Sequence, residues 1–240
     1  MSGSPDLVAA AFHWIEDLGL LAGVGSFVVR RLGRMQPRVA WANPPMHIAF
    51  ASAVVGGAWF LLTTPSILVG IRSAAEVAAL VLCLRGNRFV APFAVLAAGM
   101  LATTGHASGA GAQFAEVLHV LSAGMWAGGI LALASLRPPA GWGSPDARVM
   151  FERFGRVAII AFGVTALTGA LRATEQLNDL SQLWTTTYGA VLTLKVAGVL
   201  LMIAVSAFWR RGLVGARWDA AVTAIVVGLT GVLAAFPLQA

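Results

Sequence analysis

Histidine, glutamate, serine and methionine side chains gather in one apolar stretch, Gly105–Gly129, which reads GHASGAGAQFAEVLHVLSAGMWAGG. His106 and His119 lie on either side of a turn of small residues. In the helix predicted after the turn, residues at helical spacing share one stripe: Glu116, His119, Ser122 and Trp126. Imidazole and thioether groups at the edge of a bilayer favour a soft or borderline metal ion, and copper fits best. The stretch therefore predicts a metal site.

The composition indicates a membrane protein. Of the 240 residues, 58% are hydrophobic and only 11% are charged, whereas a soluble domain carries roughly 25% charged residues. A transmembrane helix needs about 20 apolar residues, so the chain has room for about eight spans. We predict an all-α, polytopic transmembrane helix bundle that forms a single domain over residues 1–240.

Arginines fix the expected orientation of the spans. The predicted spans are Phe12–Val29, a helix within Val39–Leu62 that starts near Pro44–Pro45, Ile67–Leu84, Phe89–Thr104, Phe114–Leu136, Val157–Leu171, Tyr188–Trp209 and Ala220–Phe236. Thirteen arginines follow the first, third, fifth and seventh spans, and only Arg72 and Arg172 lie on the other side. Because basic residues stay on the cytoplasmic side, both termini are expected outside. The same topology and anionic lipid headgroups explain the net charge of +6, so we expect a lipid bilayer partner and no nucleic acid.

This topology places three histidines at one depth near the outer face. His13 opens the first span, His106 follows the fourth, and His119 lies early in the fifth. We predict that they bind copper, with Met100 and Met125 below them as thioether ligands. Each histidine could instead satisfy loop carbonyls, and the methionines could simply pack in the core.

Two neighbours of His119 have open roles. Glu116, one turn earlier, could orient the imidazole ring as a carboxylate partner, or could be a solvated charge near the helix start. Trp126 is expected to pack or anchor rather than touch a metal. Gly124 and Gly128, four residues apart, most simply permit a close helix contact.

Two further groups lie deeper in the predicted bundle. Met46 and His47 could form an inner-side site, although adjacent helical residues point some 100° apart. Glu76 and Lys195 are charged residues within predicted spans, where an unpaired charge costs roughly 2.5–3.5 kcal/mol. They require compensation from each other or from Arg72, either as a structural ion pair or as a proton or ion relay.

The second half of the chain resembles the copper resistance protein D (CopD) family of bacterial inner-membrane proteins. The resemblance covers roughly Gly105–Pro237 and rests on three segments: HVLSAGMWAGGILAL at His119–Leu133, RFGRVAIIAFGVTALTGAL at Arg153–Leu171, and LWTTTYGAVLTLKVAGVLLMIAVSAFWRR at Leu183–Arg211. Lys195 matches the family's lysine. The resemblance implies copper transport or handling at the bacterial inner membrane, often beside a periplasmic copper-binding CopC-like partner.

Three functions stay open on the sequence. The first is copper transport or handling, with Cu(I) or Cu(II) received at the histidines. The second is a b-type haem electron-transfer protein in which two histidines ligate the haem. The third is a membrane assembly or scaffold protein without metal. An enzyme is not expected, because no nucleophile–base pair, carboxylate dyad or ATPase motif stands out.

Overall fold

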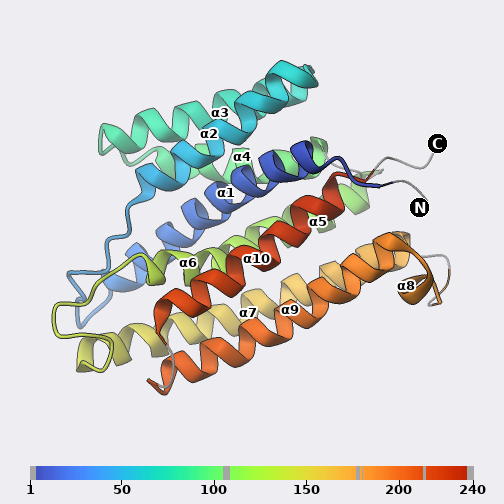
Figure 1. Cartoon of the computed structure of the whole chain (residues 1–240). Helices are drawn as coiled ribbons and strands as arrows, with labels where there is room; N and C mark the ends of the chain where they lie inside the picture. Colours follow the sequence, from blue (N-terminus) through green and yellow to red (C-terminus); the bar gives the residue numbers. More distant parts are fainter. Residues whose placement is uncertain (1–3, 105–108, 177–178, 180, 213–214, 237–240) are drawn as a thin grey trace.

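The protein is a bundle of helices in the computed structural model, which describes residues 4–104, 109–176, 179, 181–212 and 215–236. Within these ranges the elements are helices and turns, as predicted (Figure 1). Their bounds are α1 Leu7–Gly33, α2 Met46–Thr63, α3 Ile67–Leu84, α4 Val90–Thr104, α5 Ala110–Ala123, η1 Gly124–Gly128, α6 Gly129–Ala134, α7 Pro145–Gln176, α8 Gln182–Thr185, α9 Thr187–Arg210 and α10 Ala216–Ala234.

All eight predicted spans fall on helices. Seven helical segments are long and apolar enough to cross a membrane, and α5, η1 and α6 together count as one of them, Ala110–Ala134. The eighth, in α4, is a shorter apolar helix over Val90–Thr103. The backbone N–H of Asp6 donates to the carbonyl of Ala235 at 3.2 Å. The start of α1 and the end of α10 therefore lie on the same side of the bundle. An even number of spans requires this arrangement.

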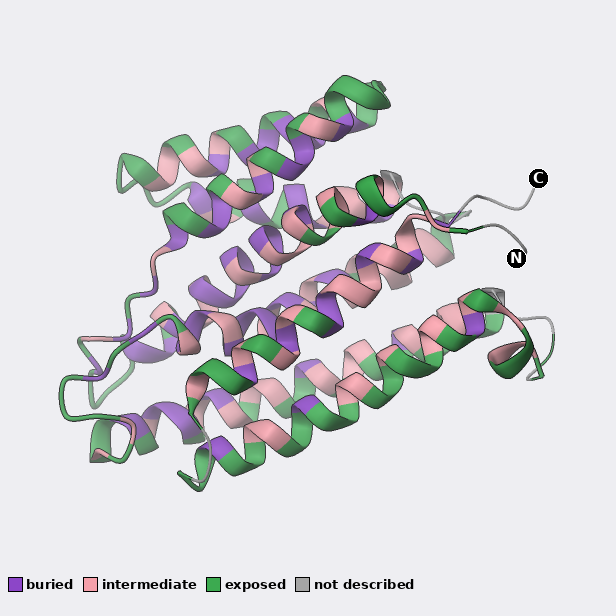
Figure 2. Ribbon diagram, in the orientation of Figure 1, coloured by how far each residue is buried: buried purple, intermediate pink, exposed green. Residues whose placement is uncertain are grey.

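Helix α1 lies at the centre of the bundle. It packs against α2, α4, α5, η1, α6, α7 and α10, and much of its surface is buried (Figures 1 and 2). Helix α9 is mostly exposed along its length, and such an apolar exposed surface suits contact with lipid. The first helix thus provides a face to nearly every element that carries a candidate site residue.

Small residues bring α1 and η1 into close contact, as the paired glycines predict. A Cβ on Gly128 would collide with the carbonyl of Leu21, and one on Gly25 would collide with the backbone at Gly128. A Cβ on Gly124 would lie 2.8 Å from the Cβ of Val24. The contact also coincides with the one π-helical turn among the described residues, Gly124–Gly128. Such turns often accompany functional sites in helices.

Helix α7 begins twelve residues before its predicted start, at Pro145 instead of Val157. The sequence between these positions carries three arginines and two acids, which suggested a loop. The added turns are held by aromatic packing, because Phe151 contacts Trp142 and Trp209 at ring centroid distances of 5.2 and 5.0 Å. Arg153 also donates to the carbonyl of Leu32 at the end of α1, at 3.0 Å.

Candidate functional site

The ring of His119 is held by α7. Its Nδ1 lies 3.1 Å from the carbonyl oxygen of Thr165 and 3.1 Å from Oγ1 of Thr168. Because a carbonyl oxygen only accepts, Nδ1 carries the proton, and in the neutral ring Nε2 keeps its lone pair. Gly169 leaves room for the ring, since a Cβ there would lie 3.2 Å from Cε1. A ring held at Nδ1 with Nε2 unprotonated is the usual state of a histidine that ligates a metal.

A network of hydroxyl and indole groups continues below His119 along the predicted stripe. Oγ1 of Thr165 lies 2.7 Å from Oγ of Ser122 and accepts from Nε1 of Trp126 at 3.2 Å. Ser122 and Trp126 are both 6% exposed, so these contacts are shielded from solvent. They fix α5 and η1 against α7 and thereby hold the backbone on which His119 stands. Trp126 acts here as a packing and hydrogen-bonding residue.

Charged groups surround His119 on the outer side. Glu116 forms an ion pair with Arg172 of α7. Arg172 also interacts electrostatically with Lys195 of α9. Lys195 in turn interacts electrostatically with Asp17 of α1 and with His119. At a rise of 1.5 Å per residue, Asp17, His119 and Lys195 lie about 12–15 Å inside the outer ends of their helices. Four helices, α1, α5, α7 and α9, therefore contribute charges to the surroundings of His119.

The other two predicted histidine ligands are not seen beside His119. His106 lies outside the described residues. The ring of His13 packs on Phe60 of α2, with ring centroids 4.2 Å apart, whereas the described hydrogen bonds of His119 reach α7. Among the described residues, no group of three or more histidine, cysteine, aspartate or glutamate side chains is placed to hold a metal ion.

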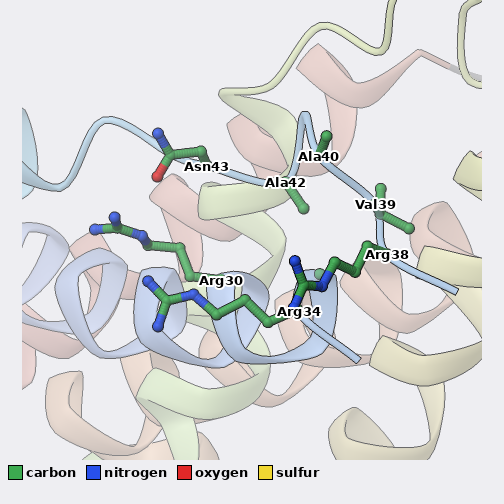
Figure 3. A pocket seen from close by; sticks show the side chains of 8 residues that line it. Arg30, Arg34, Arg38, Val39, Ala40, Ala42 and Asn43 are labelled. Atoms are coloured by element: carbon green, nitrogen blue, oxygen red, sulfur yellow. The ribbon is translucent and has the colours of Figure 1, made fainter. Parts of the chain in front are cut away.

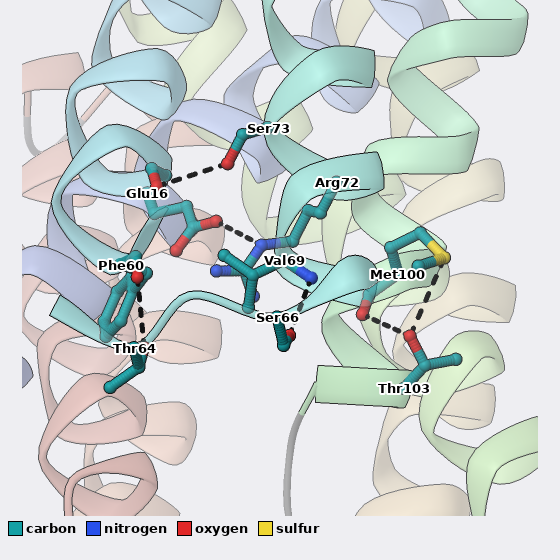
Figure 4. A network of polar contacts seen from close by, with 10 residues as sticks. Glu16, Phe60, Thr64, Ser66, Val69, Arg72, Ser73, Met100 and Thr103 are labelled. Atoms are coloured by element: carbon teal, nitrogen blue, oxygen red, sulfur yellow. Dashed lines mark hydrogen bonds and ion pairs between the residues drawn. The ribbon is translucent and has the colours of Figure 1, made fainter. Parts of the chain in front are cut away.

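The predicted methionine ligands occupy different surroundings. Met125 packs with the buried apolar clusters around α1 and η1. The Sδ of Met100 on α4 lies 3.6 Å from Oγ1 of Thr103, on the side of α3 that holds Arg72 (Figure 4). The two thioethers thus belong to different parts of the bundle.

Met46 and His47 point in different directions, as their adjacency on a helix suggested. Met46 is 3% exposed, and its Sδ lies 2.9 Å from Nη1 of Arg30. His47 is exposed on the outside of α2. The described contacts therefore bind Met46 into the protein interior and leave His47 on the surface.

The intramembrane charges divide into two groups instead of forming one pair. Nε of Arg72 lies 2.8 Å from Oε1 of Glu16 on α1 (Figure 4). Glu76 interacts electrostatically with both of these residues. Lys195 belongs to the other group, with Asp17, Glu116 and Arg172. Arg72 and Glu76 are thus together, as expected, while Lys195 is compensated elsewhere.

Sequence reasoning missed several members of these groups. Glu16, Asp17, Thr165, Thr168 and Arg172 were not proposed as members of a site. The available signal was position, because Glu16 and Asp17 lie inside the predicted first span, where charges need partners. Adjacent helical residues point some 100° apart, so Glu16 and Asp17 serve different neighbours.

At the opposite end of α1, arginines line a cavity of about 560 Å³ (Figure 3). Its lining comes from the last turn of α1 and the segment that follows: Arg30, Gly33, Arg34, Arg38, Val39, Ala40, Ala42 and Asn43. This is the end that the arginine distribution assigns to the cytoplasm. Its charge suits lipid headgroups and does not suit reception of a cation.

Comparison with known proteins finds a family match for the carboxyl-terminal part of the chain. Residues 148–236 match the family described as copper resistance protein D. This segment is similar in sequence to that family, and we call it the CopD segment. The CopD segment contains most of α7 and all of α8, α9 and α10, so it includes Thr165, Thr168, Arg172 and Lys195. The family prediction is confirmed over this range.

One curated relative extends the comparison. The copper transport protein CutJ of Bacillus subtilis (strain 168) is 33% identical over 95 residues. These residues make up 38% of this chain and 17% of that relative's length. No solved structure matches the chain. The protein is thus a multi-pass membrane protein with a segment that resembles the CopD family. The names of the family and of the relative concern copper resistance or transport instead of catalysis.

Proposed function

We propose that the protein carries copper ions across the bacterial inner membrane and receives them at the outer end of the bundle. The observation that carries the proposal is the CopD-family match over residues 148–236. The same segment contributes Thr165 and Thr168, which hold the ring of His119. The relative's name, copper transport protein, supports the same cargo.

His119 is the first residue that we assign to the copper path. Its Nδ1–H is engaged by the Thr165 carbonyl, which leaves Nε2 as the donor atom for a copper ion. Imidazole binds both Cu(I) and Cu(II), and a thioether neighbour would favour Cu(I). We propose His106, with His13 as a further candidate, as the partner that completes the receiving site. Met100 and Met125 are candidates for later, weaker contacts along the path.

The charges around His119 fit a path for a cation that must leave again. Asp17 and Glu116 carry two negative charges and Arg172 and Lys195 two positive ones, so the group is close to neutral when all are ionised. A copper ion at His119 would meet carboxylates without being trapped by an excess of them. Weak and successive binding is what transport requires, since a site that binds too tightly stops the flow.

A periplasmic CopC-like protein is the proposed copper donor. Acidic residues near the outer ends of α1 and α5, Asp6 and Glu116, would favour the approach of a cation or of its carrier, over a distance limited by salt to about 8–10 Å. Delivery by a partner would also explain how copper reaches His119 without being free in solution.

Two rival functions make different predictions for the purified protein. A b-type haem protein would show a Soret band in its absorbance spectrum and no bound copper. A scaffold protein would show neither. Neither rival gains support from the family match, which concerns copper resistance.

The test measures bound copper and the absorbance spectrum of purified protein loaded with Cu(I) or Cu(II). We expect bound copper in the wild type and at least a tenfold loss of affinity in His119→Ala. His47→Ala is the matched control, because His47 is an exposed histidine on the outside of α2, and it should bind copper as the wild type does. Equal copper binding in both variants would remove His119 from the path, and a Soret band without copper would overturn the proposal.

A further inference from the structure

Three charged side chains are closed off from solvent between α1 and α3. Glu16 and Glu76 are 0% exposed and Arg72 is 2% exposed. Nε of Arg72 lies 2.8 Å from Oε1 of Glu16, and the two side chains point toward one another (Figure 4). Arg72 also lies over the ring of Phe60, with Cζ 5.6 Å from the ring centroid. The guanidinium is therefore paired with Glu16 in an apolar enclosure.

Glu76 enters the same enclosure without a cation of its own. It lies one turn after Arg72 on α3 and interacts electrostatically with both Glu16 and Arg72. Neither of its carboxyl oxygens accepts a hydrogen bond from a described residue. Gly57 of α2 makes room for this carboxyl, since a Cβ there would collide with Oε2. Ser73, the nearest hydroxyl on the same helix, donates to the carbonyl of Gly57 instead.

The charges in this enclosure do not balance if both acids are ionised. Two carboxylates would face one guanidinium, which leaves one negative charge inside the membrane. Such a charge costs roughly 2.5–3.5 kcal/mol even on the most lenient insertion scale. Two ionised carboxylates in contact would also offer only acceptors to each other. A single proton removes both problems, because it neutralises one acid and converts the contact into a hydrogen bond.

We propose that Glu16 and Glu76 form an intramembrane proton-binding site in which one proton is shared by the two carboxyl groups while Arg72 balances the remaining charge. The site belongs to α1–α3 and lies outside the CopD segment. Helix α1 connects it to the copper path, because Asp17 follows Glu16 and interacts electrostatically with Lys195.

Among the described residues, few other groups could take this proton. The charged or titratable side chains described near the pair are Arg72 on α3 and Asp17 and His13 on α1. Helix α4 contains no titratable residue. Helix α2 contains only His47, which lies ten residues, or about 15 Å along the helix, from Gly57.

Infrared spectroscopy of the full-length protein in lipid nanodiscs tests the site without copper. We expect a carbonyl stretch of a protonated carboxylic acid at neutral pH, shifted by deuterium exchange, and its complete loss in Glu76→Gln. Glu76→Asp should keep the band at a changed frequency, which provides a second readout if the amide variant folds poorly. Asp219→Asn is the matched control, because Asp219 is a buried acid of α10 with Ser206 as its hydroxyl partner.

Three outcomes would overturn the proposal. The first is a band that Glu76→Gln leaves unchanged. The second is a band that only Asp219→Asn removes. The third is the absence of any protonated carboxyl together with a thermal stability that rises with Na⁺ or K⁺, which would assign a metal cation to the place of the proton.

Discussion

The hydroxyl of Thr165 joins the helix of His119 to the CopD segment, and its removal tests that connection. Oγ1 of Thr165 meets Oγ of Ser122 at 2.7 Å and Nε1 of Trp126 at 3.2 Å. Thr165→Val keeps the β-branched shape and removes only the hydroxyl. Hydrogen bonds between membrane helices are worth about 0.6 kcal/mol on average and up to about 1.7. The loss of two such contacts should therefore lower the free energy of unfolding by about 1–3 kcal/mol.

Reversible unfolding in mixed micelles, followed by tryptophan fluorescence, measures this change. Thr174→Val is the matched control on the same helix, because the hydroxyl of Thr174 donates only to the carbonyl of Leu171 at 2.7 Å and the residue is exposed. We expect the control to change stability by less than about 0.5 kcal/mol, and Thr165→Ser to recover much of the loss. If Thr165→Val were no less stable than Thr174→Val, the network would not join α5 to α7 and would not hold the backbone that carries His119.

Three other perturbations have definite expected outcomes. Gly128→Ala should destabilise the protein by about 1–3 kcal/mol through overpacking against α1, whereas Gly163→Ala, whose Cβ would meet nothing within 4 Å, should be neutral or stabilising in the same unfolding assay. Arg72→Met should cost about 3–5 kcal/mol at neutral pH because it leaves the Glu16 charge buried alone, and less in acid, where that carboxyl takes up a proton; a pH-independent loss would contradict this. Hydrogen bonds from the side chain and backbone of Ser181 hold the pKa of Asp179 below its ordinary value. The loop is therefore stabilised at pH values above that ordinary pKa and loses the stabilisation as pH falls through the lowered pKa. A carboxyl NMR titration measures this, and an unshifted titration would refute it.

Most of the fold follows from simple features of the sequence. Apolar runs of span length predicted all eight helices, because a backbone in lipid must satisfy its own hydrogen bonds and does so as a helix. The predicted start of α7 was wrong, because polar residues outside the membrane do not end a helix that an aromatic cluster stabilises. That cluster joins Trp142, Phe151 and Trp209 from distant parts of the chain, which no local pattern predicts. The π-helical turn at Gly124–Gly128 likewise depends on tertiary contact with α1.

The candidate site was predicted in its residue types more than in its contacts. The stripe of His119, Ser122 and Trp126 does share one face, and that face meets α7 through Thr165. The partner of Arg72 could not be found from spacing, since Glu16 is 56 residues away on another helix. Which acid pairs with which cation depends on the order of the helices around α1, and apolar runs and residue spacing do not contain that order.

Copper uptake into sealed proteoliposomes tests the central claim most directly. The protein is reconstituted into vesicles that contain a copper chelator with an optical signal, and copper is added outside. We predict saturable uptake by the wild type, uptake at the wild-type rate by His47→Ala, and at least a tenfold slower rate for His119→Ala. Uptake by the wild type no faster than in protein-free vesicles would contradict the account.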